Sequence, residues 1–179
     1  MLGAIASLND AGAALVGGHT SEGQELACGF SVNGLIDKDE ALTKSGLRIG
    51  HRLILTKALG TGALFAANMQ YRAKGPWIES ALASMLQSNQ KAAQIIHAHN
   101  AGGCTDITGF GLLGHLVEMT RASLVGARID LNAVPCLDGA VETIANGISS
   151  SLQPANLRLR RVIRESERHH DHEKYPLLF

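Results

Sequence analysis

Residues 104–115 read CTDITGFGLLGH, and this stretch decides how the rest of the chain is interpreted. It begins with a short β-capable run that carries one carboxylate, Asp106, then turns on closely spaced glycines and continues into an amphipathic helix over about 112–122. A carboxylate beside a glycine turn can approach a metal ion or a phosphate group without side-chain obstruction. We interpret Asp106 as a candidate ligand of Mg²⁺, which prefers oxygen and needs further ligands. The alternative is that Asp106 only supports the turn before the helix.

A second glycine-rich stretch, GGHTSEG at 17–23, lies near the start of the chain. Gly17, Gly18, His19 and Thr20 supply backbone N–H groups, an imidazole and a hydroxyl, a combination that suits a phosphate or a ribose hydroxyl. The Gly-Lys-Ser/Thr ending of a P-loop is absent, so a Walker-type ATPase is not indicated. A plain tight turn is the alternative, but the two stretches together point to a nucleotide and magnesium site.

The same helix start satisfies a dinucleotide-binding pattern. Gly109, Gly111 and Gly114 have the G-x-G-x-x-G spacing, and Asp130 stands near where a ribose-binding acid would lie. The run before these glycines is polar, however, where a central Rossmann strand is continuously apolar, and no second unit of that type follows. A dinucleotide-dependent oxidoreductase therefore stays open as an alternative, as does a non-catalytic binding or dimerisation module.

Composition narrows the class of protein. The 16 basic and 16 acidic residues give a formal net charge of zero, which argues against a nucleic-acid binder. The 3 cysteines form no Cys-x-x-Cys pair, so a disulfide framework or a zinc site is not indicated. We find neither a secretory signal nor an apolar window of the ~18 residues that a membrane span needs. These features indicate a cytoplasmic protein without a membrane partner.

The pattern of apolar residues predicts an α+β fold. Strands are expected over 26–36, 51–57 and 126–131, besides the run before the glycine turn; polar residues interrupt them, unlike the strands of a buried parallel sheet. Helices are expected over 2–15, 61–71, 76–99, 112–122, 137–146 and 154–167, and Pro76 suits a first helical position. Alternatively, the first helix ends at Gly12 and residues 13–16 form a short buried strand. The uncapped start and the apolar end, 176–179, suggest that the natural chain is longer.

At these motifs the sequence resembles the selenophosphate synthetases (selenide, water dikinases), within the aminoimidazole ribonucleotide synthetase-like superfamily. Residues 15–20 resemble the Gly-Gly-His-Thr/Ser segment of that family. Residues 105–116 match its Thr-Asp-Val/Ile-Thr-Gly-Phe-Gly-Leu-Leu-Gly-His signature nearly position for position, and residues 53–62 resemble the strand and glycine turn between the two motifs. The resemblance runs over essentially the whole chain.

The resemblance implies a function and a fold. The family makes selenophosphate from selenide, ATP and water with Mg²⁺, and releases AMP and phosphate. By motif, Asp106 is implied to be a magnesium ligand, and His19, Thr20 and Ser21 are implied to contact ATP across a homodimer interface. Residues 26–179 resemble the C-terminal domain, a two-layer α/β sandwich that is truncated at its end, and residues 1–25 resemble a remnant of the N-terminal ATP-binding domain.

The chain also departs from the family pattern. The N-terminal segment that carries a reactive cysteine or selenocysteine, a lysine and further metal-binding aspartates has no counterpart here. We therefore assign no catalytic residue. We expect the chain to be the central and C-terminal part of an ATP-dependent phosphotransferase and to be inactive when isolated.

Overall fold

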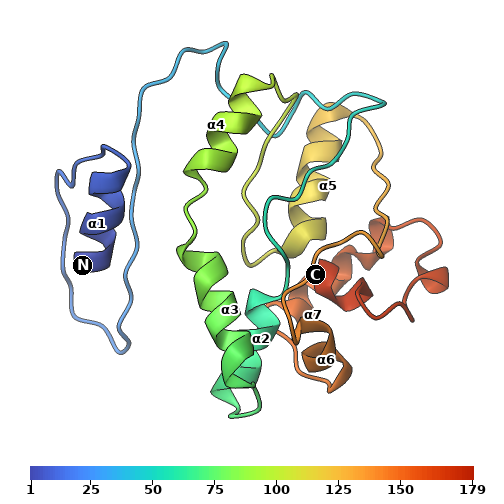
Figure 1. The fold of residues 1–179 in the computed structure, drawn as a ribbon. Helices are drawn as coiled ribbons and strands as arrows, with labels where there is room; N and C mark the ends of the chain where they lie inside the picture. Colours follow the sequence, from blue (N-terminus) through green and yellow to red (C-terminus); the bar gives the residue numbers. More distant parts are fainter. The chain divides into compact units, whose positions relative to one another are not determined.

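The computed structural model describes residues 1–179 and divides them into two compact units, Met1–Ala41 and Leu42–Phe179. The first unit contains one helix, α1 (Leu2–Asp10), and no residue in it is buried (Figure 1). The helix expected over 2–15 thus ends early, at Asp10, which is closer to the alternative end at Gly12, whose φ is +65°. The short strand expected over 13–16 in that alternative does not form. The boundary between residues 25 and 26 is inferred from the domains of the related family. It stays a prediction, separate from the boundary between the two compact units.

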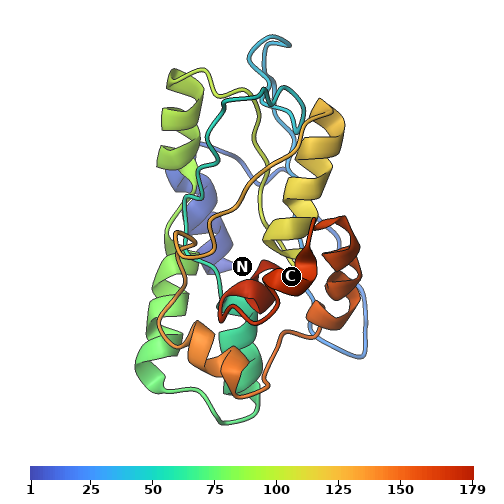
Figure 2. The same cartoon turned by 90° about the vertical axis from the view of Figure 1, so that its right-hand side faces the viewer.

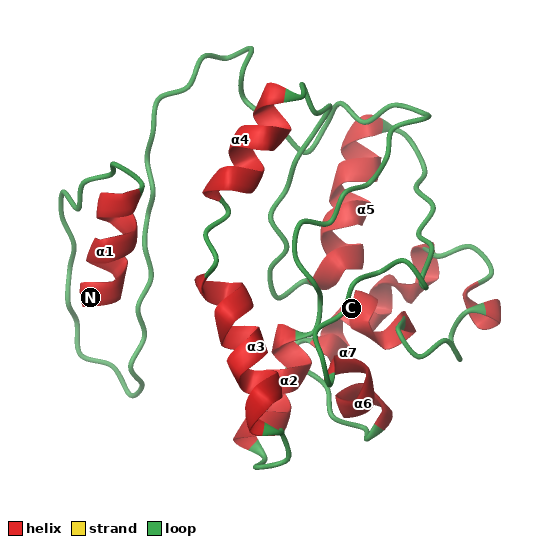
Figure 3. Ribbon diagram, in the orientation of Figure 1, coloured by secondary structure: helices red, strands yellow, loops and turns green.

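The second unit is built from short helices joined by irregular chain (Figure 3). None of the helices combines the length and the apolar character that crossing a bilayer requires. The α-helices are α2 (Thr61–Met69), α3 (Gly75–Leu86), α4 (Gln90–Ala98), α5 (Gly111–Ser123), α6 (Ala140–Ala145) and α7 (Gln153–Asn156). Three 3₁₀ turns follow α7, at Leu157–Val162, Ser166–Arg168 and Tyr175–Leu178.

One part of the core forms where α2 meets α3 and α6. Leu64 of α2 is completely buried, and so are the small residues Ala81 of α3 and Ala140 of α6. A Cβ atom on Gly60, which has a φ of +122°, would overlap the side chain of Ala140. Small residues at these positions let the helices approach closely, because no larger side chain separates their backbones.

A second cluster lies under α5. Leu113 of α5 packs with Tyr175, Leu178 and Phe179, and the Tyr175 and Phe179 rings meet edge to face with centroids 5.2 Å apart. Burial raises the pKa of the Tyr175 phenol above its usual value. The 3₁₀ turn Tyr175–Leu178 contacts both α5 and α6, so it connects the two clusters (Figure 2).

The expected strands do not form in residues 1–179. Segments 26–36, 51–57 and 126–131 and the run before the glycine turn are extended or irregular, and a single isolated parallel bridge joins Leu59 to Cys136. Alternation predicts a chain that can lie half-buried on a sheet, but a strand also needs a neighbouring backbone as hydrogen-bond partner. Leu53 and Ile54 stay 47% and 82% exposed. The strand predictions are therefore wrong, and the two-layer sandwich is not confirmed.

Two predicted helices also need correction. Pro76 lies in the first turn of a helix, as expected, but the segment 76–99 is split into α3, which begins at Gly75, and α4. Gln87 is extended at the break, where its carbonyl accepts a hydrogen bond from Lys57 Nζ at 2.5 Å, and Ser88 Oγ accepts the Gln90 N–H at 3.1 Å. The helix expected over 154–167 is reduced to α7 and the 3₁₀ turns after it.

Candidate functional site

Asp106 lies on the exposed loop between α4 and α5. The loop is tied to the preceding chain, because the Cys104 N–H donates to the Thr43 carbonyl at 2.9 Å. Thr105 Oγ1 donates to the backbone carbonyl of Asp106 at 3.1 Å, but the Asp106 carboxylate takes part in no hydrogen bond or ion pair. Its oxygen atoms are therefore available to an external partner.

Close packing holds the turn that follows Asp106. The Gly111 N–H donates to the Thr108 carbonyl at 3.1 Å, and Gly111 has a φ of +72°. A Cβ atom there would lie 2.5 Å from the carbonyl carbon of Phe179, so both backbone conformation and space require glycine. From α7, the buried Asn156 side chain donates to the Gly109 carbonyl at 2.8 Å.

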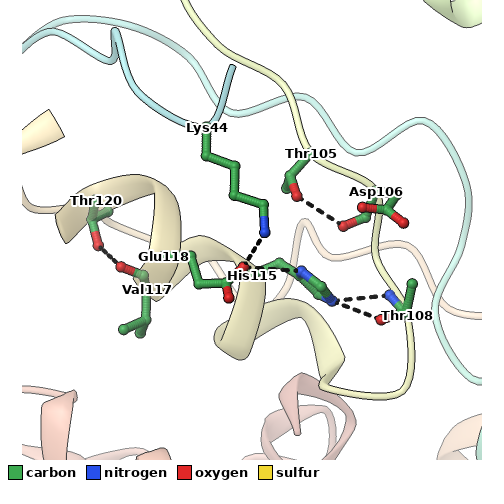
Figure 4. Close-up of polar contacts among 8 residues, drawn as sticks. All are labelled: Lys44, Thr105, Asp106, Thr108, His115, Val117, Glu118 and Thr120. Carbon is green, nitrogen blue, oxygen red and sulfur yellow. Dashed lines mark hydrogen bonds and ion pairs between the residues drawn. The ribbon is translucent and has the colours of Figure 1, made fainter. Parts of the chain in front are cut away.

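His115 of α5 reaches back to the same turn. Its side chain is buried, and its Nε2 lies 3.1 Å from both the backbone N and the Oγ1 of Thr108 (Figure 4). A backbone N–H can only donate, so Nε2 must be the unprotonated nitrogen of the ring. The neutral imidazole therefore carries its proton on Nδ1.

Glu118, one helical turn further along α5, faces that proton. Its Oε2 lies 3.5 Å from His115 Nδ1, which has no hydrogen-bond partner, and 2.6 Å from Lys44 Nζ. The hydrogen bond from Lys44 lowers the pKa of Glu118 against the opposing effect of desolvation, and the charge of Lys44 acts in the same direction as the bond. Glu118 is therefore an ionised carboxylate held between a lysine and the Nδ1 side of His115.

Asp106 is not part of a cluster of metal-ligating side chains. Nowhere in residues 1–179 do three or more His, Cys, Asp or Glu side chains gather in a way that could hold a metal ion. Mg²⁺ demands octahedral coordination and usually takes one or two carboxylates together with phosphate oxygens and water. The unpaired Asp106 carboxylate fits one position of such a site, and the remaining ligands would come from elsewhere.

The residues of the first glycine-rich stretch are exposed. His19, Thr20 and Ser21 belong to the unit Met1–Ala41, whereas Asp106 belongs to the unit Leu42–Phe179. Their side chains make no hydrogen bond within the chain. Their role in ATP binding, and their joining with Asp106 in one site, stay predictions.

Packing within the chain accounts for the glycines of the dinucleotide pattern. A Cβ atom on Gly109 would lie 2.5 Å from Leu152 Cδ1, and one on Gly114 would lie 3.1 Å from the Cβ of Phe110. Asp130 Oδ1 accepts the Asn132 N–H at 3.0 Å in a local turn. With no strand before α5 and the protein's own chain against its first turn, the arrangement lacks the strand–turn–helix unit that binds a dinucleotide.

Reasoning from sequence missed the polar residues behind the turn. The motif at 104–115 contains His115 but indicates no role for it, and no motif marks Glu118, Lys44 or Asn156. The i, i+3 spacing of His115 and Glu118 on one helix was a usable signal, because such residues lie on the same face. Lys44 gave no signal, since it lies 74 positions from Glu118 in the sequence.

Comparison with known proteins identifies relatives of this chain. The family model described as AIR synthase related protein, C-terminal domain, matches residues 48–151. The chain is similar to the selenide, water dikinase of Geobacter metallireducens, with 43% identity over 148 residues, and to that of Trichlorobacter lovleyi, with 42% identity over 142 residues. The selenide, water dikinase of Clostridioides difficile is 36% identical over 146 residues.

These matches cover most of this chain but less than half of each relative. The aligned segments take in 83%, 79% and 82% of this chain, and 43%, 41% and 42% of the respective relatives. The resemblance read from the two motifs is thereby confirmed.

Proposed function

Because this chain belongs to the AIR synthase related proteins, in which it matches the C-terminal domain, we propose that it is part of a selenophosphate synthetase. The complete enzyme makes selenophosphate from selenide, ATP and water, and releases AMP and phosphate. The names of the curated relatives and the near-continuous match of residues 105–116 to the family signature support this function.

A single observation carries the proposal: the Asp106 carboxylate is exposed and unpaired on a turn that is held from behind by His115 and Asn156. A carboxylate kept at a fixed place without an internal partner suits a ligand of the Mg²⁺ that accompanies ATP. The bound cation would neutralise phosphate charge during phosphoryl transfer. Asp106 supplies one of its ligands.

The other parts of the site are proposed from the family resemblance. His19, Thr20 and Ser21 bind ATP across the interface of a homodimer that acts in the cytoplasm. Residues 1–25 belong to the ATP-binding domain, and residues 26–179 belong to the C-terminal domain, whose two-layer sandwich forms in the complete enzyme. Residues 1–179 contain no cluster of metal ligands, so we expect them to be inactive alone. Selenide-dependent release of AMP from the isolated chain would contradict that expectation.

The experiment replaces Asp106 within an active protein. A chimera is made in which this chain replaces the matched segment of the Geobacter metallireducens selenide, water dikinase, and selenide-dependent AMP release is measured. We expect Asp106→Asn to lower turnover by about 100-fold or more, because a metal-bridging charge is lost. The matched control is Asp130→Asn, which keeps the oxygen that accepts the Asn132 N–H and should leave turnover near that of the unsubstituted chimera.

Near-normal turnover in Asp106→Asn would make Asp106 a structural residue of the turn.

Calorimetry with NAD tests the dinucleotide alternative on the same protein. Saturable NAD binding that is lost in Gly111→Val would overturn the phosphotransferase assignment.

A further inference from the structure

The proposed chemistry does not use His115, although it is one of the most buried polar side chains of the second unit. Its exposed fraction is 4%; Nε2 accepts the Thr108 amide, and Nδ1 meets only the Glu118 carboxylate at 3.5 Å. Burying a polar ring costs free energy unless its nitrogen atoms are satisfied. An apolar side chain could fill the same space without that cost. The position therefore points to a role for the hydrogen bond to Thr108.

We propose that His115 is a positioning residue that acts through the Thr108 amide, in its Nδ1-protonated form, to set the direction of Asp106. The part of this inference that concerns metal binding rests on the proposed function of Asp106. His115 itself does not touch Asp106. It fixes the backbone two residues further along the chain.

The turn is fixed at two peptide groups that are separated by one other peptide group. The N–H of Thr108 is held by His115 of α5, and the carbonyl of Gly109 is held by Asn156 of α7. With both groups anchored, the backbone of the turn is restricted to one conformation. Asp106 lies just before this restricted segment (Figure 4). A ligand that is ordered before the metal arrives loses less conformational entropy on binding.

Glu118 and Lys44 favour the tautomer that this role requires. The ionised Glu118 carboxylate attracts a proton on Nδ1, and Lys44 holds that carboxylate in place at 2.6 Å. The opposite tautomer would set an Nε2–H donor against the N–H donor of Thr108, and Nδ1 would then turn a lone pair toward a negative charge. From Lys44 through Glu118 and His115 to Thr108, each contact therefore pairs a donor or positive group with an acceptor or negative group.

The first test is spectroscopic and does not depend on activity. The imidazole ¹⁵N resonances of His115 and the exchange of backbone amides are measured by NMR on the 179-residue chain at neutral pH. We expect a pyrrole-type Nδ1, a pyridine-type Nε2, and a Thr108 amide that exchanges more slowly than that of Ile107, which has no backbone partner in the structure. A ring protonated on Nε2, or equal exchange at the two amides, would overturn the inference.

The second test compares two substitutions in the chimera. His115→Gln keeps an acceptor close to the position of Nε2, whereas His115→Phe keeps a ring without one. We expect His115→Phe to raise the Mg²⁺ concentration at half-maximal rate by about tenfold, and His115→Gln to restore most of it, because supporting hydrogen bonds of metal ligands have effects of this size. Equal Mg²⁺ responses of the two variants would contradict the role.

The two tests separate this inference from the proposed function. If Asp106→Asn is fully active while the Thr108 amide is protected, the metal role of Asp106 fails and the hold on the turn remains. If the amide is unprotected while Asp106→Asn is inactive, the positioning role fails alone. Should His115→Phe not fold, the spectrum of the unsubstituted chain still decides the tautomer and the hydrogen bond.

Discussion

Glu118 links the polar contacts of α5 at the scale of single residues. It lies between Lys44, from the segment between α1 and α2, and the buried His115, and its own side chain is 49% exposed. Solvent screens a pair this exposed, so its contribution to stability is small. Its importance lies instead in geometry, because the pair holds the carboxylate against the Nδ1 side of His115.

We predict that Lys44→Met raises the pKa of Glu118 toward its ordinary value of 4.5, because the Lys44 hydrogen bond is the largest cause that lowers it. A lowered folded-state pKa means that the pair stabilises the fold above the ordinary value, and that this stabilisation is lost as the pH falls through the folded pKa. A titration of the side-chain carboxyl ¹³C resonance measures the change.

The matched control for that titration is Lys57→Met. Lys57 donates to the Gln87 carbonyl rather than to a carboxylate, so its removal should leave the Glu118 midpoint in place. An unchanged midpoint in Lys44→Met would show that the Lys44–Glu118 contact does not form in solution.

The start of α5 shows, at the scale of elements, how a glycine motif can serve packing. Gly111 is the first residue of the helix and has a φ of +72°, and the backbone of Phe179 occupies the space that a side chain would need. A Cβ atom on Gly109 would meet the end of the Leu152 side chain, and one on Gly114 would come close to the Cβ atom of Phe110. At Gly109 and Gly111, the spacing that suggested a dinucleotide site therefore reflects close packing against later parts of the chain.

We predict that Gly111→Ala destabilises the fold by about 1–3 kcal/mol, because it combines a left-handed backbone with a steric overlap. Gly126→Ala is the control, since a Cβ atom there meets nothing within 4 Å and the φ of Gly126 is not in the left-handed range. It should change stability by less than about 0.5 kcal/mol. Urea denaturation of both variants measures the difference, and equal midpoints would contradict the packing of α5 against Phe179.

The elements that the sequence predicted well are those with local signals. Pro76 marks the start of α3, and the glycines before Thr61 and Leu112 mark the starts of α2 and α5. The strands failed because pairing depends on a distant backbone that no local pattern specifies. The break between α3 and α4 was missed for a related reason, since Lys57 binds the Gln87 carbonyl from 30 positions away.

The residues of the candidate site also differ in whether a local motif marks them. Its exposed residue, Asp106, could be chosen from a local motif, and it does lie exposed on a glycine turn. The residues that hold the turn and His115 could not be predicted in that way, because they come from distant segments. Lys44 contacts Glu118 of α5, and Asn156 contacts Gly109 of the turn. The family was easier to predict than the architecture here, because the signature of residues 105–116 is contiguous.

The two units of the whole molecule differ in how much apolar surface they bury. Met1–Ala41 contains no buried residue, whereas Leu42–Phe179 contains two clusters that share the turn Tyr175–Leu178. An isolated helix as short as α1 is marginal in water, because nucleation costs more than a few hydrogen bonds return. Stability is therefore concentrated in the second unit.

We predict that hydrogen exchange follows this division in the isolated chain. Amides of residues 1–41 should exchange fast, and those of α2, α5 and α6 around the buried clusters should exchange slowest, because they open only with the core. Exchange measured by mass spectrometry on peptides gives the profile. Slow exchange throughout residues 13–41 would show that this unit has a core that the structure does not contain.

The most direct measurement of the central claim is a crystal structure of the chimera with Mg²⁺ and a non-hydrolysable ATP analogue. We predict a magnesium ion with an Asp106 carboxylate oxygen in its coordination sphere, at about 2.0–2.1 Å, beside oxygens of the polyphosphate. A fully ligated ion bound to other carboxylates, with Asp106 outside its coordination sphere, would contradict the assignment of Asp106 and the purpose proposed for the turn behind it.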